Sequence, residues 1–516
     1  MADIKILWAD DEIDLLKPQI MFLQKKGYAV TTVTNGHDAI EKCREDKPEV
    51  VFLDESMPGL TGLETLTHIK EIDSNLPIVM ITKNEEENLM EEAIGSQITD
   101  YLIKPVNPNQ ILMSLKKILD SKDLRSEKTN ALYQQEFQKI FMEVQNVNTY
   151  DEWAELYMRL IYWELELDKN NATAMSEVFS MQKNEANATF NKFIEKNYLN
   201  WIKGNSDSPT LSHTLFKNKI FPKLKNDATN FVVVIDNLRY DQWRILQPIF
   251  NEYFKINTED YFYSILPTCT QYSRNAIFSG LMPSEISRRY RDKWLNDDEE
   301  GGKNMHEEFF LQEQIRLSNR DYKLSYSKIT NHNNAKNLVD NMTNLLNNDL
   351  NVIVYNFVDM LSHARTEMEV LKELASDEAA YRSLTLSWFE HSPLLEALKK
   401  IADKPVNLIV TTDHGTVRVK KASKIIGDRN TTTNLRYKNG KNLSFNKKDV
   451  FEVKDPIEAG LPKSNLSSSY VFAKDDLYFV YPNNFNYYAN YFKNTFQHGG
   501  ISLEEVIVPC IHLTNK

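Results

Sequence analysis

The segment NLIVTTDHG, residues 407–415, decides the fold of the larger part of the chain. It opens with the apolar, largely β-branched run LIV and closes with Asp413, His414 and a glycine. A short run of this kind predicts a buried strand, and open α/β sheets collect functional groups beyond the carboxyl ends of their strands. A carboxylate and an imidazole at such a place suit a metal such as zinc. Taken by itself, however, the segment is more typical of an Asx-turn followed by a surface histidine.

Other segments of the C-terminal half repeat this pattern. The apolar strand VVVI ends at Asp236, the strand NVIVYNF is followed by Asp359 and His363, and His498 opens a glycine turn before another apolar run. Together with the first segment they supply three aspartates and three histidines. A set of this kind suits two zinc ions. The expected zinc ligands are Asp236, Asp359, His363, Asp413, His414 and His498.

The sequence PTCT at 267–270 lies between these segments and precedes a predicted helix. A threonine at the start of a helix is in the first place a good N-cap. A helix N-terminus also binds phosphate through its free N–H groups and its dipole, and a threonine held on a metal can become a nucleophile. Arg274, one turn further on, would face the same side. We therefore expect Thr270 and Arg274 to be catalytic residues.

Residues 1–120 show the same arrangement in a smaller sheet. Four predicted strands end on the Asp10-Asp11 pair, on Asp54, on Thr82 and on Lys104. Strands that alternate with amphipathic helices predict a parallel, doubly wound sheet, so these side chains should share one edge. Carboxylates in one pocket bind a hard cation such as magnesium.

This edge carries the groups that a phosphoryl transfer needs. Asp54 would attack a phosphoryl donor, while magnesium and Lys104 neutralise the phosphoryl oxygens. Thr82 would offer its hydroxyl to the new phosphate, and Tyr101, three residues before Lys104, would move with it. We expect Asp54 to be the phosphoacceptor and Thr82, Tyr101 and Lys104 to be switch residues.

The set Asp10-Asp11, Asp54 before MPG, Thr82, Tyr101 and Lys104-Pro105 resembles the receiver domain of two-component response regulators. The resemblance implies a flavodoxin-like fold and a cis bond before Pro105. It also implies that Asp11, Asp54 and the carbonyl of Ser56 bind magnesium directly, and that Asp10 binds it through water. The alternative is a degenerate receiver that is not phosphorylated.

Length and composition limit the number of domains and the class of protein. The 516 residues suffice for two to four domains of roughly 100–200 residues each. A formal net charge of −12 disfavours a general nucleic-acid binder. Three cysteines cannot form a disulfide framework, and the first residues do not read as a signal peptide. No apolar run approaches the ~20 residues of a membrane span. We expect a cytoplasmic protein.

Residues 121–210 are expected to form a helical bundle connector. No glycine lies between Gly95 and Gly204, and no proline between Pro108 and Pro209, which argues for helices. Aromatic residues recur there at helical spacing, which is more often core than a binding site. Such a bundle would relay phosphorylation or form a dimer interface, or it is a passive spacer. We find no basic helix-turn-helix module, the usual receiver output, after it.

Residues 211–516 resemble the alkaline-phosphatase superfamily of metallohydrolases, in particular its PglZ-type members. The resemblance rests on VVVID, PTCT, NFVDMLSH, TTDHG and HGGISLEEVIVP, in the order of the superfamily. It implies an alkaline-phosphatase-like α/β sandwich in which Asp359, His363 and His498 hold one zinc. The second zinc is implied to bind Asp236, Asp413, His414 and the hydroxyl of Thr270. Thr270 is implied to be the nucleophile and to pass through a phosphothreonine intermediate.

The residues around Cys269 and two charged stretches bear on the reaction and its substrate. Sulfatases of this superfamily need a proline that is missing after Cys269, whereas its phosphodiesterases use a threonine in the Pro-Thr-x-Thr setting found here. Residues 418–448 carry ten basic residues against one acidic residue. They would steer a nucleotide or oligonucleotide, or they are only a solvated face. The charged stretch 287–303 reads as an insertion or lid of open role.

The whole chain thus resembles the PorX-type response regulators of bacterial type IX secretion, an α/β multidomain architecture. The resemblance implies a sensor histidine kinase as partner, a homodimer on phosphorylation, and regulation through a partner such as a sigma factor. Two functions follow. One is a phosphorylation-controlled dizinc phosphodiesterase, and the other is a regulatory scaffold that binds a transcription or sigma factor with little turnover.

Overall fold

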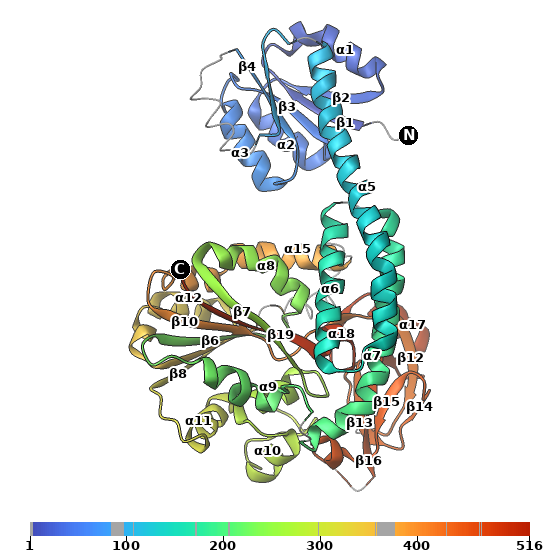
Figure 1. Cartoon of the computed structure of the whole chain (residues 1–516), viewed down its shortest axis with the longest axis vertical. Helices are drawn as coiled ribbons and strands as arrows, with labels where there is room; N and C mark the ends of the chain where they lie inside the picture. Colours follow the sequence, from blue (N-terminus) through green and yellow to red (C-terminus); the bar gives the residue numbers. More distant parts are fainter. Residues whose placement is uncertain are drawn as a thin grey trace. The chain divides into compact units, whose positions relative to one another are not determined.

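Figure 1 shows the computed structural model of the chain, which divides into two compact units. The first unit comprises Met1–Ala131 and Asn170–Ala172, and the second comprises Leu132–Lys169 and Thr173–Lys516. The structure describes residues 4–83, 98–106, 108–170, 173–204, 207–297, 299–356, 358, 377–429, 431–463, 465 and 467–516.

The first unit is built on a parallel sheet of strand order β2-β1-β3-β4-β5. This order is that of flavodoxin-like doubly wound folds, as the sequence predicted. The strands are β1 (Ile4–Ala9), β2 (Tyr28–Val33), β3 (Val50–Asp54), β4 (Ile78–Thr82) and β5 (Asp100–Ile103). Between them lie α1 (Lys17–Lys25), α2 (Gly36–Asp46) and α3 (Gly62–Ile72).

The alternation of side chains along β1 shows how this sheet forms two cores. Ile6 and Trp8 belong to the apolar cluster on one face, where the Trp8 ring lies 5.2 Å from that of Phe52. Leu7 and Ala9 belong to the cluster on the other face. Successive residues of a strand point to opposite faces, so a continuous apolar run fits a sheet that is covered on both sides.

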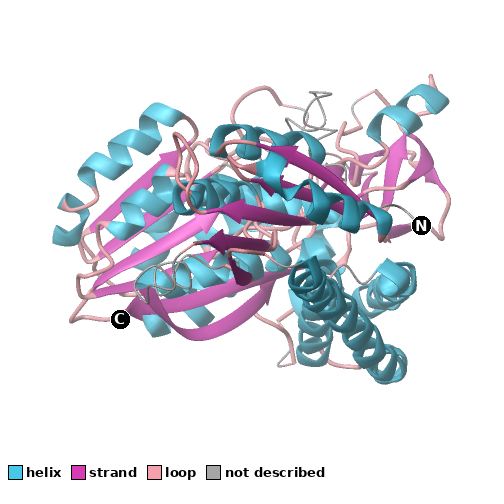
Figure 2. Ribbon diagram, turned by 90° about the horizontal axis from the view of Figure 1, so that it is seen from above, coloured by secondary structure: helices cyan, strands magenta, loops and turns pink. Residues whose placement is uncertain are grey.

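The connector consists of three helices, as the missing glycines and prolines predicted. They are α5 (Pro108–Asn146), α6 (Tyr150–Lys169) and α7 (Thr173–Ile202). The ring of Trp153 on α6 packs 5.2 Å from that of Phe190 on α7, and Tyr133 on α5 donates to Gln182 on α7 at 2.8 Å. Figure 2 shows this bundle nearly end-on. Helices α6 and α7 belong to the same compact unit as the C-terminal region, whereas α5 is divided between the two units.

A six-stranded mixed sheet of order β7-β19-β10-β6-β9-β8 organises the second unit. The four strands β10, β6, β9 and β8 are parallel to one another. Strand β19 pairs antiparallel with β10, and the edge strand β7 pairs antiparallel with β19. Helices α8 and α15 cover one face and α9 and α11 the other (Figure 1). The strands are β6 (Thr229–Ile235), β7 (Phe254–Tyr263), β8 (Leu324–Ile329), β9 (Leu350–Tyr355), β10 (Val406–Thr411) and β19 (Ile507–Asn515).

The helices of this unit lie between these strands along the chain. They are α8 (Tyr240–Tyr253), α9 (Thr270–Ser279), α10 (Pro283–Arg289), α11 (Glu307–Leu317), α12 (His332–Asn341), α15 (Glu378–Glu390), α16 (Pro393–Lys399), α17 (Phe485–Phe492) and α18 (Leu503–Val506). Within the described part of the chain, none of the helices has the length and apolarity that crossing a bilayer requires.

The basic stretch 418–448 contributes strands to three small sheets. Arg436 and Lys438 are fully buried, so not all of the basic residues of this stretch face solvent. The strands of the small sheets are β11 (Val417–Arg418), β12 (Lys421–Ile426), β13 (Tyr437–Lys441), β14 (Ser444–Phe445), β15 (Val450–Val453), β16 (Ser468–Ala473), β17 (Leu477–Val480) and β18 (Phe496–Gln497).

Candidate functional site

The carboxyl edge of the first sheet gathers three aspartates. One carboxylate oxygen each from Asp10, Asp11 and Asp54 lies within 4.8 Å of the others, and Asp10 and Asp54 are buried. Lys104 Nζ lies 2.8 Å from Asp10 Oδ2 and 3.0 Å from Asp54 Oδ1. Oxygen ligands of this kind suit a hard cation such as magnesium. The structure thus brings together four residues that the sequence predicted to meet.

The electrostatics of this edge favour a cation. Burial raises the pKa of Asp54 to about 6; Lys104 opposes this rise, whereas the charges of Asp10 and Asp11 add to it. A divalent cation would offset both the burial and the repulsion between carboxylates, and so favour the ionised Asp54.

The expected switch residues lie on or directly after β4 and β5, the two strands that follow β3 in the sheet. Thr82 ends β4, and its hydroxyl donates to Glu55 Oε2 at 3.0 Å, a partner that the sequence did not indicate. Tyr101 on β5 is 39% exposed. Ser56 follows Glu55 and is exposed. The Lys104–Pro105 bond is cis, as expected from the resemblance.

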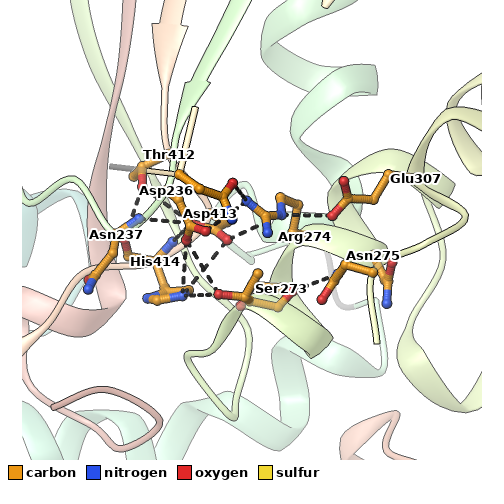
Figure 3. Close-up of polar contacts among 12 residues, drawn as sticks. Asp236, Asn237, Ser273, Arg274, Asn275, Glu307, Thr412, Asp413 and His414 are labelled. Carbon is orange, nitrogen blue, oxygen red and sulfur yellow. Dashed lines mark hydrogen bonds and ion pairs between the residues drawn. The ribbon is translucent and has the colours of Figure 1, made fainter. Parts of the chain in front are cut away.

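The large sheet of the second unit forms a second cluster at the carboxyl ends of two parallel strands. Asp236 follows β6, and Asp413 and His414 follow β10. One ligand atom from each of the three lies within 4.8 Å of the others, and all three side chains are buried (Figure 3). Because β6 and β10 are direct neighbours in the sheet, the strand pairing itself brings Asp236 next to Asp413.

Thr270 brings a hydroxyl to this cluster. Its Oγ1 lies 3.3 Å from Asp236 Oδ1 and 3.1 Å from His414 Nε2. Thr270 is the first residue of α9, and the N-cap residue is Cys269. Thr270 is therefore not the N-cap of α9. Its hydroxyl contacts Asp236 and His414 instead.

Arg274 lies one turn along α9 and is almost fully buried. Its Nη1 donates to Asp236 Oδ2 at 2.9 Å, and its Nε donates to Glu307 Oε1 at 2.8 Å (Figure 3). Burial alone would lower the pKa of Arg274, but Asp236 and Glu307 raise it above its usual value. Its guanidinium is thus held between two carboxylates, and Glu307 is a partner that the sequence did not indicate.

The carboxylate of Asp413 is oriented by backbone donors. Its Oδ1 accepts from the backbone N–H of Asn237 at 3.2 Å and of His414 at 3.1 Å. Burial alone would raise the pKa of Asp413, but His414 and Arg274 outweigh it and hold the pKa below its usual value.

One buried oxygen of this cluster points to a cation. Among the described residues, Asp413 Oδ2 has no hydrogen-bond partner, and it lies 3.8 Å from Arg274 Nε and from His414 Nε2. A buried carboxylate oxygen without a close partner is costly. Two carboxylates, an imidazole and a hydroxyl are a donor set that fits zinc.

His498 completes the described part of the site. Its ring stacks on that of His414 with 4.4 Å between the centroids. The other two expected zinc ligands, Asp359 and His363, lie outside the described residues.

The two segments of open role meet beside Thr270. Asp297, in the stretch 287–303, accepts a hydrogen bond from Tyr272 of α9 at 2.7 Å and from Tyr437 of β13 at 3.0 Å. Asn304, just after that stretch, donates to the backbone carbonyl of Thr270 at 3.1 Å. The stretch 287–303 and the basic segment 418–448 are therefore joined to each other and to the start of α9.

We expect Asp297→Ala to lower the free energy of unfolding by about 1–3 kcal/mol, because it removes the carboxylate that accepts the buried Tyr272 and Tyr437 hydroxyls. Thermal unfolding measures the effect. Asp292→Ala is the matched control, since Asp292 belongs to the same stretch and its side chain is 75% exposed. Equal unfolding midpoints for the two variants would contradict a stabilising role of the hydrogen bonds that Asp297 accepts.

Comparisons with known proteins agree with this architecture. A response regulator receiver domain matches residues 6–116, a PorX response regulator linker domain matches 123–202, and a BREX system PglZ alkaline phosphatase-like domain matches 215–513. The chain is 32% identical over 117 residues to the transcriptional regulatory protein ResD of Bacillus subtilis, covering 23% of this chain and 48% of ResD. It is 30% identical over 115 residues to the chemotaxis protein CheY of Thermotoga maritima, covering 22% of this chain and 96% of CheY.

Solved structures of receiver proteins also match the chain. Chemotaxis protein CheY4 of Vibrio cholerae is 29% identical, with a TM-score of 0.22, 23% of this chain covered and 99% of that chain. A CheY-like receiver domain protein of Methanospirillum hungatei is 22% identical, with a TM-score of 0.23, 23% of this chain covered and 96% of that chain. The PglZ match spans more than half of the 516 residues. The chain therefore belongs to the family of PglZ alkaline phosphatase-like proteins, in the PorX-type architecture that joins this domain through a linker to a response regulator receiver domain.

Proposed function

We propose that the C-terminal region is a zinc-dependent phosphodiesterase with Thr270 as its nucleophile. The observation that carries this proposal is the meeting of Asp236, Asp413 and His414 around the hydroxyl of Thr270. A hydroxyl among carboxylates and an imidazole at a helix N-terminus is an arrangement suited to phosphoryl transfer.

The residues divide into a ligand set and a nucleophile. Asp236, Asp413, His414 and the Thr270 hydroxyl would hold one zinc, and His498 would hold the second together with Asp359 and His363. When bound, the two ions supply Lewis acidity at the attacking and leaving oxygens. The Thr270 hydroxyl proton has an acceptor in place at Asp236 Oδ1.

The reaction proceeds in two displacements. Thr270 Oγ1 forms a bond to phosphorus as the bond to one ester oxygen breaks, and the departing alkoxide takes up the proton that the Thr270 hydroxyl gives up. Water then attacks the phosphothreonine, which releases the phosphomonoester and restores the hydroxyl. Arg274 acts here as a positioning residue rather than a catalytic one, because its contacts are with Asp236 and Glu307.

The N-terminal unit acts as the regulatory input. Asp54 accepts a phosphoryl group from a sensor histidine kinase, and Asp10, Asp11, Asp54 and the Ser56 carbonyl would hold magnesium. Thr82, Tyr101 and Lys104 respond to the new charge. The architecture supports a cytoplasmic regulator of type IX secretion that dimerises on phosphorylation and acts on a partner such as a sigma factor.

The substrate class is a nucleotide or an oligonucleotide. Basic residues of 418–448 carry the attraction for a polyanion, and Tyr437 of that segment is tied through Asp297 to the start of α9. The second candidate function is a scaffold that binds zinc and a regulatory partner without turnover.

Metal analysis joined to a substrate comparison tests the proposal. We expect the purified full chain to retain two zinc ions and to hydrolyse bis-p-nitrophenyl phosphate with a kcat/KM about tenfold or more above that for the monoester. Preference for the monoester would replace the diesterase by a phosphatase. Zinc retention with no turnover of either ester would favour the scaffold.

A further inference from the structure

The short helix α18 contacts the connector helix α7 on one side and the segment that carries His414 on the other. Figure 1 shows α18 next to α7. On the connector side, Lys183 Nζ of α7 lies 3.1 Å from Glu504 Oε1 of α18 and 2.8 Å from Glu164 Oε2 of α6. Glu504 is buried. A buried carboxylate needs such a partner, so α7 supplies the charge that allows Glu504 to stay inside.

Asn187, one turn after Lys183, holds the start of α18 with both ends of its amide. Its Oδ1 accepts from the backbone N–H of Leu503 at 2.8 Å, and its Nδ2 donates to Glu504 Oε2 at 3.2 Å. The Leu503 N–H is one of the groups that a helix start leaves without an internal partner. A single side chain of α7 therefore fixes both the backbone and a side chain of α18.

On its other side, α18 touches the segment that carries His414. The backbone N–H of Gly415 donates to the carbonyl of Glu505 at 3.2 Å. A Cβ on Gly415 would lie 1.9 Å from the carbonyl oxygen of Glu504, so the two backbones are in direct contact. The Gly415 carbonyl in turn lies 3.1 Å from His414 Nδ1. A proton on Nδ1 leaves Nε2 with the lone pair, and Nε2 is the atom that faces Thr270.

The same helix also fixes the turn that carries His498. The backbone N–H of Gly500 donates to Glu505 Oε1 at 2.9 Å, and Arg436 Nη2 lies 2.6 Å from Glu505 Oε2. Both carboxylates of α18 therefore have partners. Glu504 contacts the connector helix α7, and Glu505 contacts the turn that carries His498. Displacing α18 would move His414 and His498 together.

We propose that Asn187 and Lys183 of the connector are positioning residues for His414 and His498, and that they act through α18. The proposal rests on the proposed function only in taking His414 and His498 to be zinc ligands. It means that the hydrolase site is completed by the connector, so that a rearrangement of α7 changes the geometry of the metal ligands. None of these connector residues touches the reacting groups.

Amide hydrogen exchange of the full-length chain gives a readout that does not depend on turnover. In Asn187→Ala we expect exchange in peptides that cover 412–416 and 498–502 to be about fivefold or more faster, while peptides of β6 keep their protection. Asn184→Ala is the matched control, because Asn184 lies on the same helix with an exposed side chain. It should exchange as the unsubstituted chain does.

Zinc affinity, measured by competition with a chelator, gives the second readout. We expect Asn187→Ala to bind zinc about tenfold or more weakly, as is usual when a residue that orients a metal ligand is lost. Lys183→Met should act in the same direction, and Lys183→Arg should restore most of the affinity because it keeps the charge beside Glu504.

Each outcome decides the matter. Unchanged exchange of 412–416 in both Asn187→Ala and Lys183→Met would overturn the proposal. If Asn187→Ala loses amide-exchange protection throughout the chain, the test is made by comparing Lys183→Met with Lys183→Arg. Faster exchange of 412–416 in Lys183→Met alone would then support the proposal, and equal exchange in the two variants would overturn it. A chain that hydrolyses no ester and binds no zinc would refute the proposed function, while faster exchange confined to these two peptides would still support the positioning role of α7.

Discussion

Thr270→Val is expected to lower kcat for a phosphodiester by about a thousandfold or more, because valine keeps the shape of threonine and removes the attacking oxygen. The hydroxyl lies within 3.3 Å of Asp236 Oδ1 and of His414 Nε2, so it is the oxygen placed for attack. Asp236, Asp413 and His414 remain in the variant. Zinc content should therefore stay close to that of the unsubstituted chain, which separates the loss of the nucleophile from the loss of the metal.

Thr270→Ser is the matched control, since it keeps the hydroxyl at the first position of α9. It should retain most of the turnover. Turnover of Thr270→Val at the unsubstituted rate would show that another group attacks phosphorus. If the unsubstituted chain holds zinc and turns over no diester, the two variants will not differ and the scaffold becomes the better account of the C-terminal region.

Asp54→Asn is expected to abolish the uptake of a phosphoryl group from acetyl phosphate in the presence of magnesium. Asparagine keeps the shape of the side chain but cannot form the acyl phosphate. Intact-protein mass spectrometry measures the added group directly. Asp73→Asn is the control, because Asp73 precedes β4 and so belongs to the opposite edge of the sheet. An undiminished mass gain in Asp54→Asn would assign phosphorylation to another residue.

Strand ends explain why so much of both sites could be predicted from the sequence. Asp54 and Asp236 each follow an apolar run, and parallel strands bring such residues to one edge without further information. The same reasoning placed Lys104 beside Asp54 and Asp413 beside Asp236. The position of the Thr270 hydroxyl was harder to predict, because a threonine at a helix start is usually an N-cap. Only the distances to Asp236 and His414 show where its hydroxyl points.

The partners of these residues could not be predicted, because they come from distant segments of ordinary composition. Glu307 pairs with Arg274 from the first turn of α11, and Asp297 reaches Tyr272 from an irregular stretch. Asn187 lies 316 residues before Leu503, whose N–H it accepts. A lone asparagine on a helix carries no local signal of such a contact, so only tertiary structure reveals it.

The contact between Gly415 and α18 limits how genes for this architecture can vary. The obstacle to a larger residue is a carbonyl oxygen of the main chain, which cannot rotate aside as a side chain would. A library randomised at this codon and selected for a working hydrolase should return glycine alone. The final letter of TTDHG would then be read as a steric requirement, and its loss in a homologous gene would mark a protein whose hydrolase has fallen out of use.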